Sequence, residues 1–112
     1  MKILLTGVTG YIGNAVMEHF ACKANEIHCL VRRDVEPAHD FINYHVLKGD
    51  NLREILSAVK PDVVVHIASL FLAAHSFDDI DNLINSNITF PTKLLEAMAE
   101  AGVTRFINTG TS

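Results

Sequence analysis

The chain has little cysteine, and none of it stands in a paired pattern. Its two cysteines, Cys22 and Cys29, are seven residues apart, and neither C-x-x-C nor a zinc-finger spacing of Cys and His occurs. This argues against a disulfide framework and a structural zinc site. We expect both cysteines to be small buried apolar side chains.

Long basic runs and long apolar runs are also missing. The longest basic run is Arg32-Arg33 and the net charge is −4, which argues against a nucleic-acid partner. The longest apolar stretch, residues 63–74, is interrupted by His66 and Ser69 and falls short of the roughly 20 residues that span a bilayer. We therefore expect a cytoplasmic protein with neither a nucleic-acid nor a membrane partner.

Metal-binding patterns are lacking as well. The six histidines show no ligand spacing, and the acidic run Asp78, Asp79 and Asp81 lacks the glycine and the terminal acid of a calcium loop. We expect this run to be the solvated start of a helix, and we predict no metal site.

What is present is one domain's worth of alternating strand and helix patterns. The chain has 112 residues, 49% of them hydrophobic, which fits a single globular domain over residues 1–112. Short apolar segments predict strands at residues 2–6, 26–31, 43–47, 62–67 and 105–109, and helical spacing predicts helices at 11–24, 51–59 and 78–101. The pattern indicates an α/β fold with a doubly wound parallel sheet of Rossmann type.

The ends of these elements carry their own signals. Asp50 or Asn51 is expected to cap the helix at 51–59, and Pro61 follows its end. Pro91 is expected inside the last helix, with Gly102 as its stop. The fifth strand leads directly to the last residue, so we expect the chain to be truncated after that strand and to be the N-terminal part of a longer protein.

Three glycines lie where the first strand should turn into the first helix. Gly7, Gly10 and Gly13 would supply the tight turn, the close approach of the backbone to a pyrophosphate, and the close packing of helix on strand. The free amides at the start of the helix would face the phosphates. We predict dinucleotide binding; the alternative is a structural turn that happens to contain three glycines.

With these residues in view, the chain resembles the N-terminal part of the extended short-chain dehydrogenase/reductase family, which includes nucleotide-sugar epimerases, dehydratases and reductases. The resemblance rests on Thr6-Gly7-x-x-Gly10-x-x-Gly13, on Gly49-Asp50, which is similar to the segment whose acid contacts adenine, on His66-Ile-Ala68-Ser69, and on Asn87 ahead of Thr92. In the third segment Ser69 replaces the family's second alanine. The resemblance implies cofactor contacts from Gly7, Thr9, Gly10, Tyr11, Ile12, Gly13, Asp50, Asn51, His66, Ala68, Ser69 and Asn87.

The end of the second predicted strand bears on the choice of nicotinamide cofactor. NAD selection needs an acid there to bind the ribose hydroxyls, and Val31 occupies that position. Arg32 and Arg33 follow, and a guanidinium could bind a 2′-phosphate. The sequence favours NADP over NAD; the alternative is that Asp34 takes the acid's part in a shifted register.

The resemblance also implies a catalytic tyrosine, a lysine, and a serine or threonine at the end of the fifth strand. Thr111 best matches the catalytic serine or threonine of the family, and Ser112 is the adjacent alternative. The alternative without a catalytic role is an ordinary polar strand end. Tyr44 and Lys48 satisfy Y-x-x-x-K, but they fall on a predicted strand rather than one turn apart on a helix. We reject this pair and expect the chain alone to bind the cofactor without turnover.

These observations lead to three hypotheses. The first is the NAD(P)-binding portion of an oxidoreductase, epimerase or dehydratase that acts on a nucleotide sugar or a related alcohol or ketone by hydride transfer. The resemblance implies a parent enzyme with a C-terminal substrate lobe that often dimerises through a helix at about residues 82–101. The alternatives are a non-catalytic NADP-sensing regulator of the same fold and a bare scaffold without a ligand.

Overall fold

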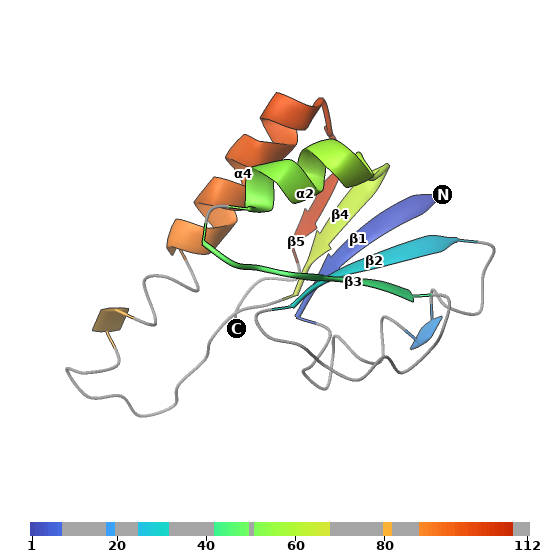
Figure 1. Cartoon of the computed structure of the whole chain (residues 1–112), viewed down its shortest axis with the longest axis horizontal. Helices are drawn as coiled ribbons and strands as arrows, with labels where there is room; N and C mark the ends of the chain where they lie inside the picture. The colour runs from blue at the N-terminus through green and yellow to red at the C-terminus, as the bar shows by residue number, and fades with distance from the viewer. Residues whose placement is uncertain are drawn as a thin grey trace.

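Five parallel strands form one sheet in the order β3-β2-β1-β4-β5 (Figure 1). The computed structural model describes residues 1–7, 18–19, 25–31, 42–49, 51–67, 80–81 and 88–108. The strands are β1 (Lys2–Thr6), β2 (Glu26–Val31), β3 (Ile42–Val46), β4 (Val63–His66) and β5 (Phe106–Asn108). This strand order confirms the predicted Rossmann-type sheet.

The strand ends follow from where their neighbours stop. β1 and β2 have the predicted bounds, whereas β3 lies one residue earlier than predicted and β4 is one residue shorter at each end. β4 pairs with β1 only as far as His66 opposite Thr6, because β1 ends there. β3 likewise ends at Val46, which pairs with Val31, the last residue of β2. β5 begins one residue later than predicted, and Thr109 lies outside the described residues.

Alternate side chains of the strands form two separate apolar clusters on the two faces of the sheet. On one face, strand residues such as Leu4 and Val64 pack with the helices α2 (Leu52–Val59) and α4 (Phe90–Ala101), which lie side by side over the sheet (Figure 1). The other face buries Ile3, Leu5, Ile27, Cys29, Val31, Ile42, Val63 and Val65. This period of two with both faces buried is what the continuous β-branched run in β4 predicts.

The start of α2 differs from the predicted capping. Asn51 stands at the N-cap position, but its side chain makes no hydrogen bond to the helix. The side chain instead binds the turn before the helix, so the expected cap is wrong for Asn51, and Asp50 lies outside the described residues. At the other end Lys60 adopts a left-handed conformation (φ +47°) and its N–H donates to the Leu56 carbonyl, with Pro61 following as expected.

The start of α4 also corrects a prediction. The helix predicted over residues 78–101 is described as α4 only from Phe90 onward, so Pro91 lies in its first turn rather than in its middle. A proline is tolerated there, since the amides of the first turn have no partner within the helix. Residues 80–81 are helical, and 82–87 lie outside the described residues. Gly102 ends α4 as predicted, at φ +76°, where a residue with a side chain would be strained.

The described part of the core matches the predicted burial. Cys29 is buried as expected, Met98 is buried as well, and Cys22 lies outside the described residues. Burial raises the pKa of the Cys29 thiol to about 12, so it stays protonated and acts as an apolar side chain.

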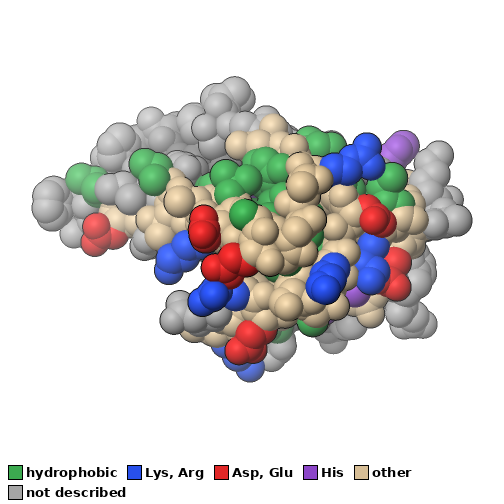
Figure 2. All heavy atoms as spheres, turned by 90° about the horizontal axis from the view of Figure 1, so that it is seen from above, with side chains coloured by type: hydrophobic (Ala, Val, Ile, Leu, Met, Phe, Trp, Pro, Cys, Tyr) green, Lys and Arg blue, Asp and Glu red, His purple; other side chains and the backbone are tan. Residues whose placement is uncertain are grey.

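Figure 2, which looks down on α2 and α4, shows acidic and basic side chains interspersed on this face. Within the described segments, none of the helices is long and apolar enough to cross a membrane.

Candidate functional site

The candidate site lies at the carboxyl ends of β1 and β4. The chain leaves β1 toward β2 on one side, whereas β4 pairs with β1 on the other side. Connections therefore diverge at this point, and parallel sheets bind ligands in the crevice that such a divergence opens. The three glycines of the sequence motif begin at this place, directly after Thr6.

Gly7 is the described member of that motif. It follows the last residue of β1 and has φ +79°, a conformation that residues with a side chain rarely adopt. The first glycine is therefore required by the backbone, as the motif predicts. Five further predicted contact residues, Thr9, Gly10, Tyr11, Ile12 and Gly13, lie outside the described residues.

Two polar side chains hold the strands together beneath this turn. Thr6 Oγ1 lies 2.7 Å from His66 Nδ1, and both residues are buried, with only 1% and 3% of their surface exposed. The Ile67 N–H donates both to Thr6 Oγ1 and to the Thr6 carbonyl, each at 3.2 Å. The hydroxyl thus connects the end of β1 to the main chain and to the side chain of β4.

The His66 ring lies among aromatic side chains on the face covered by α2 and α4. Its centroid is 5.6 Å from that of Phe90 and 6.2 Å from that of Phe106. Burial lowers the pKa of His66, so the ring is neutral at pH 7. The ring therefore joins β1, β4, β5 and the start of α4, a role that the sequence motif alone did not reveal. Ala68 and Ser69, the rest of that motif, lie outside the described residues.

A second anchored turn lies at the carboxyl end of β3. The Leu47 N–H donates to the Val31 carbonyl at 2.8 Å, which places this turn beside the end of β2. Asn51 then binds the turn through its side chain, and Gly49 has φ +60°. The turn, which contains Gly49, thus lies next to the end of β2, after which Arg32 and Arg33 continue the chain. Arg32, Arg33 and Asp50 themselves lie outside the described residues.

Of the remaining candidate residues from the sequence, some are described by the structure and others are not. Asn87 and Thr111 lie outside the described residues, although β5, which precedes Thr111 by three residues, pairs its last residue Asn108 with His66. Tyr44 lies on β3 and Lys48 in the turn after it, which confirms that this pair is not on a helix. Across the described ranges, no group of three or more His, Cys, Asp or Glu could hold a metal ion.

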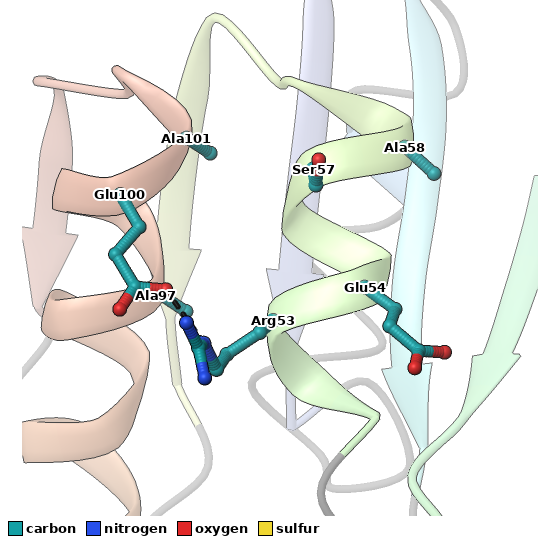
Figure 3. A pocket seen from close by; sticks show the side chains of 7 residues that line it. All are labelled: Arg53, Glu54, Ser57, Ala58, Ala97, Glu100 and Ala101. Atoms are coloured by element: carbon teal, nitrogen blue, oxygen red, sulfur yellow. Dashed lines mark hydrogen bonds and ion pairs between the residues drawn. The ribbon is translucent and has the colours of Figure 1, made fainter.

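A shallow hollow of about 630 Å³ lies elsewhere, between α2 and α4 (Figure 3). Its walls carry the small side chains Ser57, Ala97 and Ala101, and Arg53 Nε contacts Glu100 Oε2 across it at 2.6 Å. Both partners of this ion pair are exposed, so it adds little stability. We interpret the hollow as the seam between the two helices.

Comparisons with known proteins agree with this geometry. The sequence model of the NAD dependent epimerase/dehydratase family matches residues 3–112. A GDP-mannose 4,6-dehydratase of Vibrio cholerae is 30% identical over 131 residues, which cover 99% of this chain and 35% of that enzyme.

Solved structures show the same fold. A UDP-glucose 4-epimerase of Thermotoga maritima, determined with UDP-glucose, superposes with a TM-score of 0.82 at 23% identity, over 96% of this chain and 37% of that one. A UDP-glucose 4-epimerase of Stenotrophomonas maltophila with bound NAD gives 0.81 at 21% identity, over 96% and 36%. The chain spans little more than a third of these relatives' length. With its parallel sheet, its glycine turn and a family match over residues 3–112, the chain belongs to the NAD dependent epimerase/dehydratase family.

Proposed function

We propose that the chain binds a nicotinamide dinucleotide and forms part of an enzyme that modifies a nucleotide sugar. One observation carries the proposal: Gly7, at φ +79°, turns the chain directly after β1 at the point where β1 and β4 diverge. This is where dinucleotides bind in sheets of this topology, and a glycine there lets the main chain approach a diphosphate. The family match supports the same proposal.

Three groups of residues along the carboxyl edge of the sheet would each bind a different part of the dinucleotide. Thr9, Gly10, Tyr11, Ile12 and Gly13 would surround the diphosphate through the main chain. Asp50 would contact the adenine beyond β2 and β3, and Ala68, Ser69 and Asn87 would line the nicotinamide half beyond β4. Because the ring of His66 is buried against Thr6, any contact from His66 would come from its main chain.

When bound, the nicotinamide would accept a hydride from the sugar and return it. Thr111 would bond the reacting oxygen of the substrate, since it follows β5 by three residues and β5 ends beside His66. The substrate class is a nucleotide sugar, in line with the names of the relatives, a GDP-mannose 4,6-dehydratase and two UDP-glucose 4-epimerases.

Two observations bear on the choice between NAD and NADP. The Stenotrophomonas structure holds NAD, which supports NAD for the family fold. In this chain Val31 ends β2, where NAD selection needs an acid, and Arg32 and Arg33 follow, which supports NADP. The pair of arginines is a property of this chain itself, so we propose that NADP binds at least as tightly as NAD.

Isothermal calorimetry of the chain with NAD⁺ and NADP⁺ tests the proposal. We expect binding of at least one dinucleotide, and at least a tenfold weaker affinity in Gly7→Ala, because alanine is strained at this φ. Gly102→Ala is the matched control, since Gly102 has nearly the same φ but precedes the amino end of β5. Absence of binding to the unaltered chain, or equal losses in the two variants, would contradict the proposal.

A further inference from the structure

A row of three polar side chains, Glu26, His28 and His45, joins β2 to β3. Glu26 Oε2 lies 2.7 Å from His28 Nε2, and His28 Nδ1 lies 2.8 Å from His45 Nε2. The two imidazole rings are nearly parallel, at 20°, with their centroids 5.1 Å apart. Glu26 and His28 belong to β2 and His45 belongs to β3. This polar row therefore connects the two strands through side chains, in addition to their main-chain pairing.

The hydrogen bonds of the polar row determine where the ring protons lie. The contact with His28 lowers the pKa of Glu26, so Glu26 is a carboxylate wherever histidines titrate. A carboxylate only accepts hydrogen bonds, so His28 Nε2 carries a proton and donates it. In the neutral His28 ring Nδ1 is then an acceptor, and the proton of the second bond belongs to His45 Nε2. Both neutral rings are therefore protonated at Nε2.

This arrangement accepts one further proton but not two. A proton added at His45 Nδ1 leaves His45 Nε2 as the donor to His28, so both hydrogen bonds persist. A second proton has only His28 Nδ1 left, and it would set two N–H groups and two positive charges against each other across 2.8 Å. Burial, and secondarily His28, lower the pKa of His45, so the doubly charged row forms only below the ordinary value of 6.5. The bond between the strands is then replaced by repulsion.

The charges around the polar row do not balance two protonated rings. Among the described residues, β1 contributes Lys2, whose Nζ lies 3.7 Å from Glu26 Oε2. From α2, Glu54 extends on the side away from α4, whereas Arg53 extends toward α4 (Figure 3). With both rings charged, Lys2 and the two histidines outnumber the carboxylate of Glu26. Glu54 is the acid of α2 that would offset part of this excess.

β3 is the strand that this repulsion would affect. In the sheet formed by the described residues, β3 lies at the edge and pairs with β2 alone. We propose that Glu26, His28 and His45 form a pH-sensitive link that holds β3 on β2 and opens when both rings are protonated. The Leu47 N–H, which donates to the Val31 carbonyl at 2.8 Å just after β3, would open with it. This proposal does not depend on the binding of a dinucleotide.

Nitrogen-15 NMR of the histidine side chains tests the proton positions. At pH 7.5 we expect both His28 and His45 to carry their proton on Nε2. Between pH 7.5 and 5 we expect the two rings to titrate as a coupled pair, with a change at either ring seen at both. Two rings that titrate independently, or a proton on Nδ1 of either neutral ring, would overturn the proposed link.

Amide hydrogen exchange over the same pH range measures how firmly β3 is held. We expect the protection factors of β3 and of Leu47 to fall by about tenfold as the second proton binds, the effect of one lost hydrogen bond. Val103 is the internal reference, because its N–H donates to the Met98 carbonyl at 2.8 Å beyond the other end of the sheet, after α4. We expect its protection factor to stay constant.

Two variants separate the parts of the link. In His45→Gln the amide can still donate to His28 Nδ1 but cannot take up a proton, so we expect the protection of β3 to be independent of pH. Glu26→Gln keeps an acceptor for His28 Nε2 and loses the negative charge that stabilises the cationic rings. We therefore expect β3 to open at a lower pH in this variant. Glu54→Gln is the matched control, since it removes the same charge from α2, and we expect a smaller shift.

The outcomes decide the proposal. A loss of protection that is confined to β3 and Leu47, and absent from His45→Gln, supports the link. If β3 keeps its protection while both rings become charged, or loses it equally in His45→Gln, the link is overturned. If Val103 loses protection together with β3, the chain unfolds as a whole and the link is likewise overturned. Glu26 is exposed, so Glu26→Gln against Glu54→Gln decides the question where His45→Gln does not fold, and equal shifts overturn the link.

Discussion

Thr6 Oγ1 and His66 Nδ1 lie 2.7 Å apart and join β1 to β4 directly below the turn at Gly7. The two residues are sixty positions apart in the sequence and opposite each other in the sheet. Their contact fixes the distance between the two strands whose divergence opens the proposed binding crevice. The floor of the candidate site is therefore a buried polar contact between two strands whose other buried side chains are apolar.

Removing the Thr6 hydroxyl tests this contact. We expect Thr6→Val to lower the free energy of unfolding by about 1 to 3 kcal/mol, because the valine cannot bind the His66 ring or the Ile67 N–H in a buried place. Urea unfolding followed by circular dichroism measures the change. Thr6→Ser, which keeps the hydroxyl and loses only the methyl group, is the control. An unchanged free energy of unfolding in Thr6→Val, which keeps that methyl group, would show that the hydroxyl contacts do not stabilise the fold.

The buried histidine predicts a dependence of stability on pH. Burial lowers the pKa of His66 in the folded protein below its ordinary value of 6.5, so the unfolded chain binds more protons in that range. The stability from this group is fully present above pH 6.5 and is lost as the pH falls from 6.5 through the lower folded pKa. Burial, and secondarily the nearby His28, also lower the pKa of His45, which adds a loss in the same direction.

Urea unfolding at intervals between pH 7.5 and 5 measures this loss. In His66→Asn, whose amide can still reach Thr6, we expect the slope of the free energy of unfolding against pH to fall by up to about one bound proton. His45→Gln should remove the second contribution in the same way. A slope that is unchanged in His66→Asn would show that the ring does not titrate differently in the folded protein.

The sequence predicted those parts of the fold that depend on local signals. β1 ends directly before Gly7 and α4 directly before Gly102, and both boundaries were correct because a positive φ is a strong local requirement. The start of the last helix was placed too far before Pro91, because proline both interrupts helices and begins them, and the residues around it do not distinguish these cases. The parallel sheet of Rossmann type followed from the alternation of strands and helices, and the comparisons agree with it.

The details of the site were less accessible from the sequence. The glycine motif and His66 were found from their pattern, but the contact of His66 with Thr6 depends on the register between two distant strands. Asn51 was expected as a cap, because asparagine binds the backbone both at helix starts and in turns, and the choice between them is made by the surrounding main chain. A Gly-Asp-Asn sequence after a strand is typical of a turn, and this pattern could have indicated that Asn51 binds the turn rather than the helix.

Gly49 provides a test of backbone strain separate from packing. Its φ is +60° and nothing lies within 4 Å of the place where a Cβ would stand, so a substitution meets conformational strain without a clash. We expect Gly49→Ala to lower the free energy of unfolding by about 1 kcal/mol. Gly49→Asn should cost less, because asparagine tolerates the left-handed region, and equal costs would indicate that another effect of the side chain dominates.

The arginines after β2 give a prediction on cofactor choice. We expect Arg32→Asp to weaken NADP⁺ more than NAD⁺ by roughly 1.5 to 3 kcal/mol, the effect of one lost hydrogen bond to a charged group. Calorimetry with both dinucleotides measures the ratio of affinities. Arg53→Asp is the control, since it makes the same charge change at an exposed position on α2. An unchanged ratio in Arg32→Asp would favour the alternative in which Asp34 takes the acid's place.

The exposed side of α4 leads to a prediction on association with a second copy. Thr92, Leu95 and Ala99 are exposed and spaced by three and four residues, which places them on one side of α4, away from the buried Leu94; Ile88, two residues before α4, is exposed as well. Ile88 and Leu95 leave 61% and 46% of their surface exposed, which is unusual for large apolar side chains so close together. A pair of such helices would bury these residues against each other.

We therefore expect the chain to form a dimer that Leu95→Glu weakens by at least tenfold. The variant removes about 1.5 to 3 kcal/mol of apolar burial per leucine and places a carboxylate at the contact. Sedimentation equilibrium over a range of concentrations measures the dissociation constant. Lys93→Glu is the control, because it adds the same carboxylate to an exposed position of α4 that lies off the apolar line. Two identical helices that cross at this side would bring each Leu95 close to its counterpart. Equal dissociation constants in Leu95→Glu and Lys93→Glu would therefore show that this side of α4 is not the dimer contact.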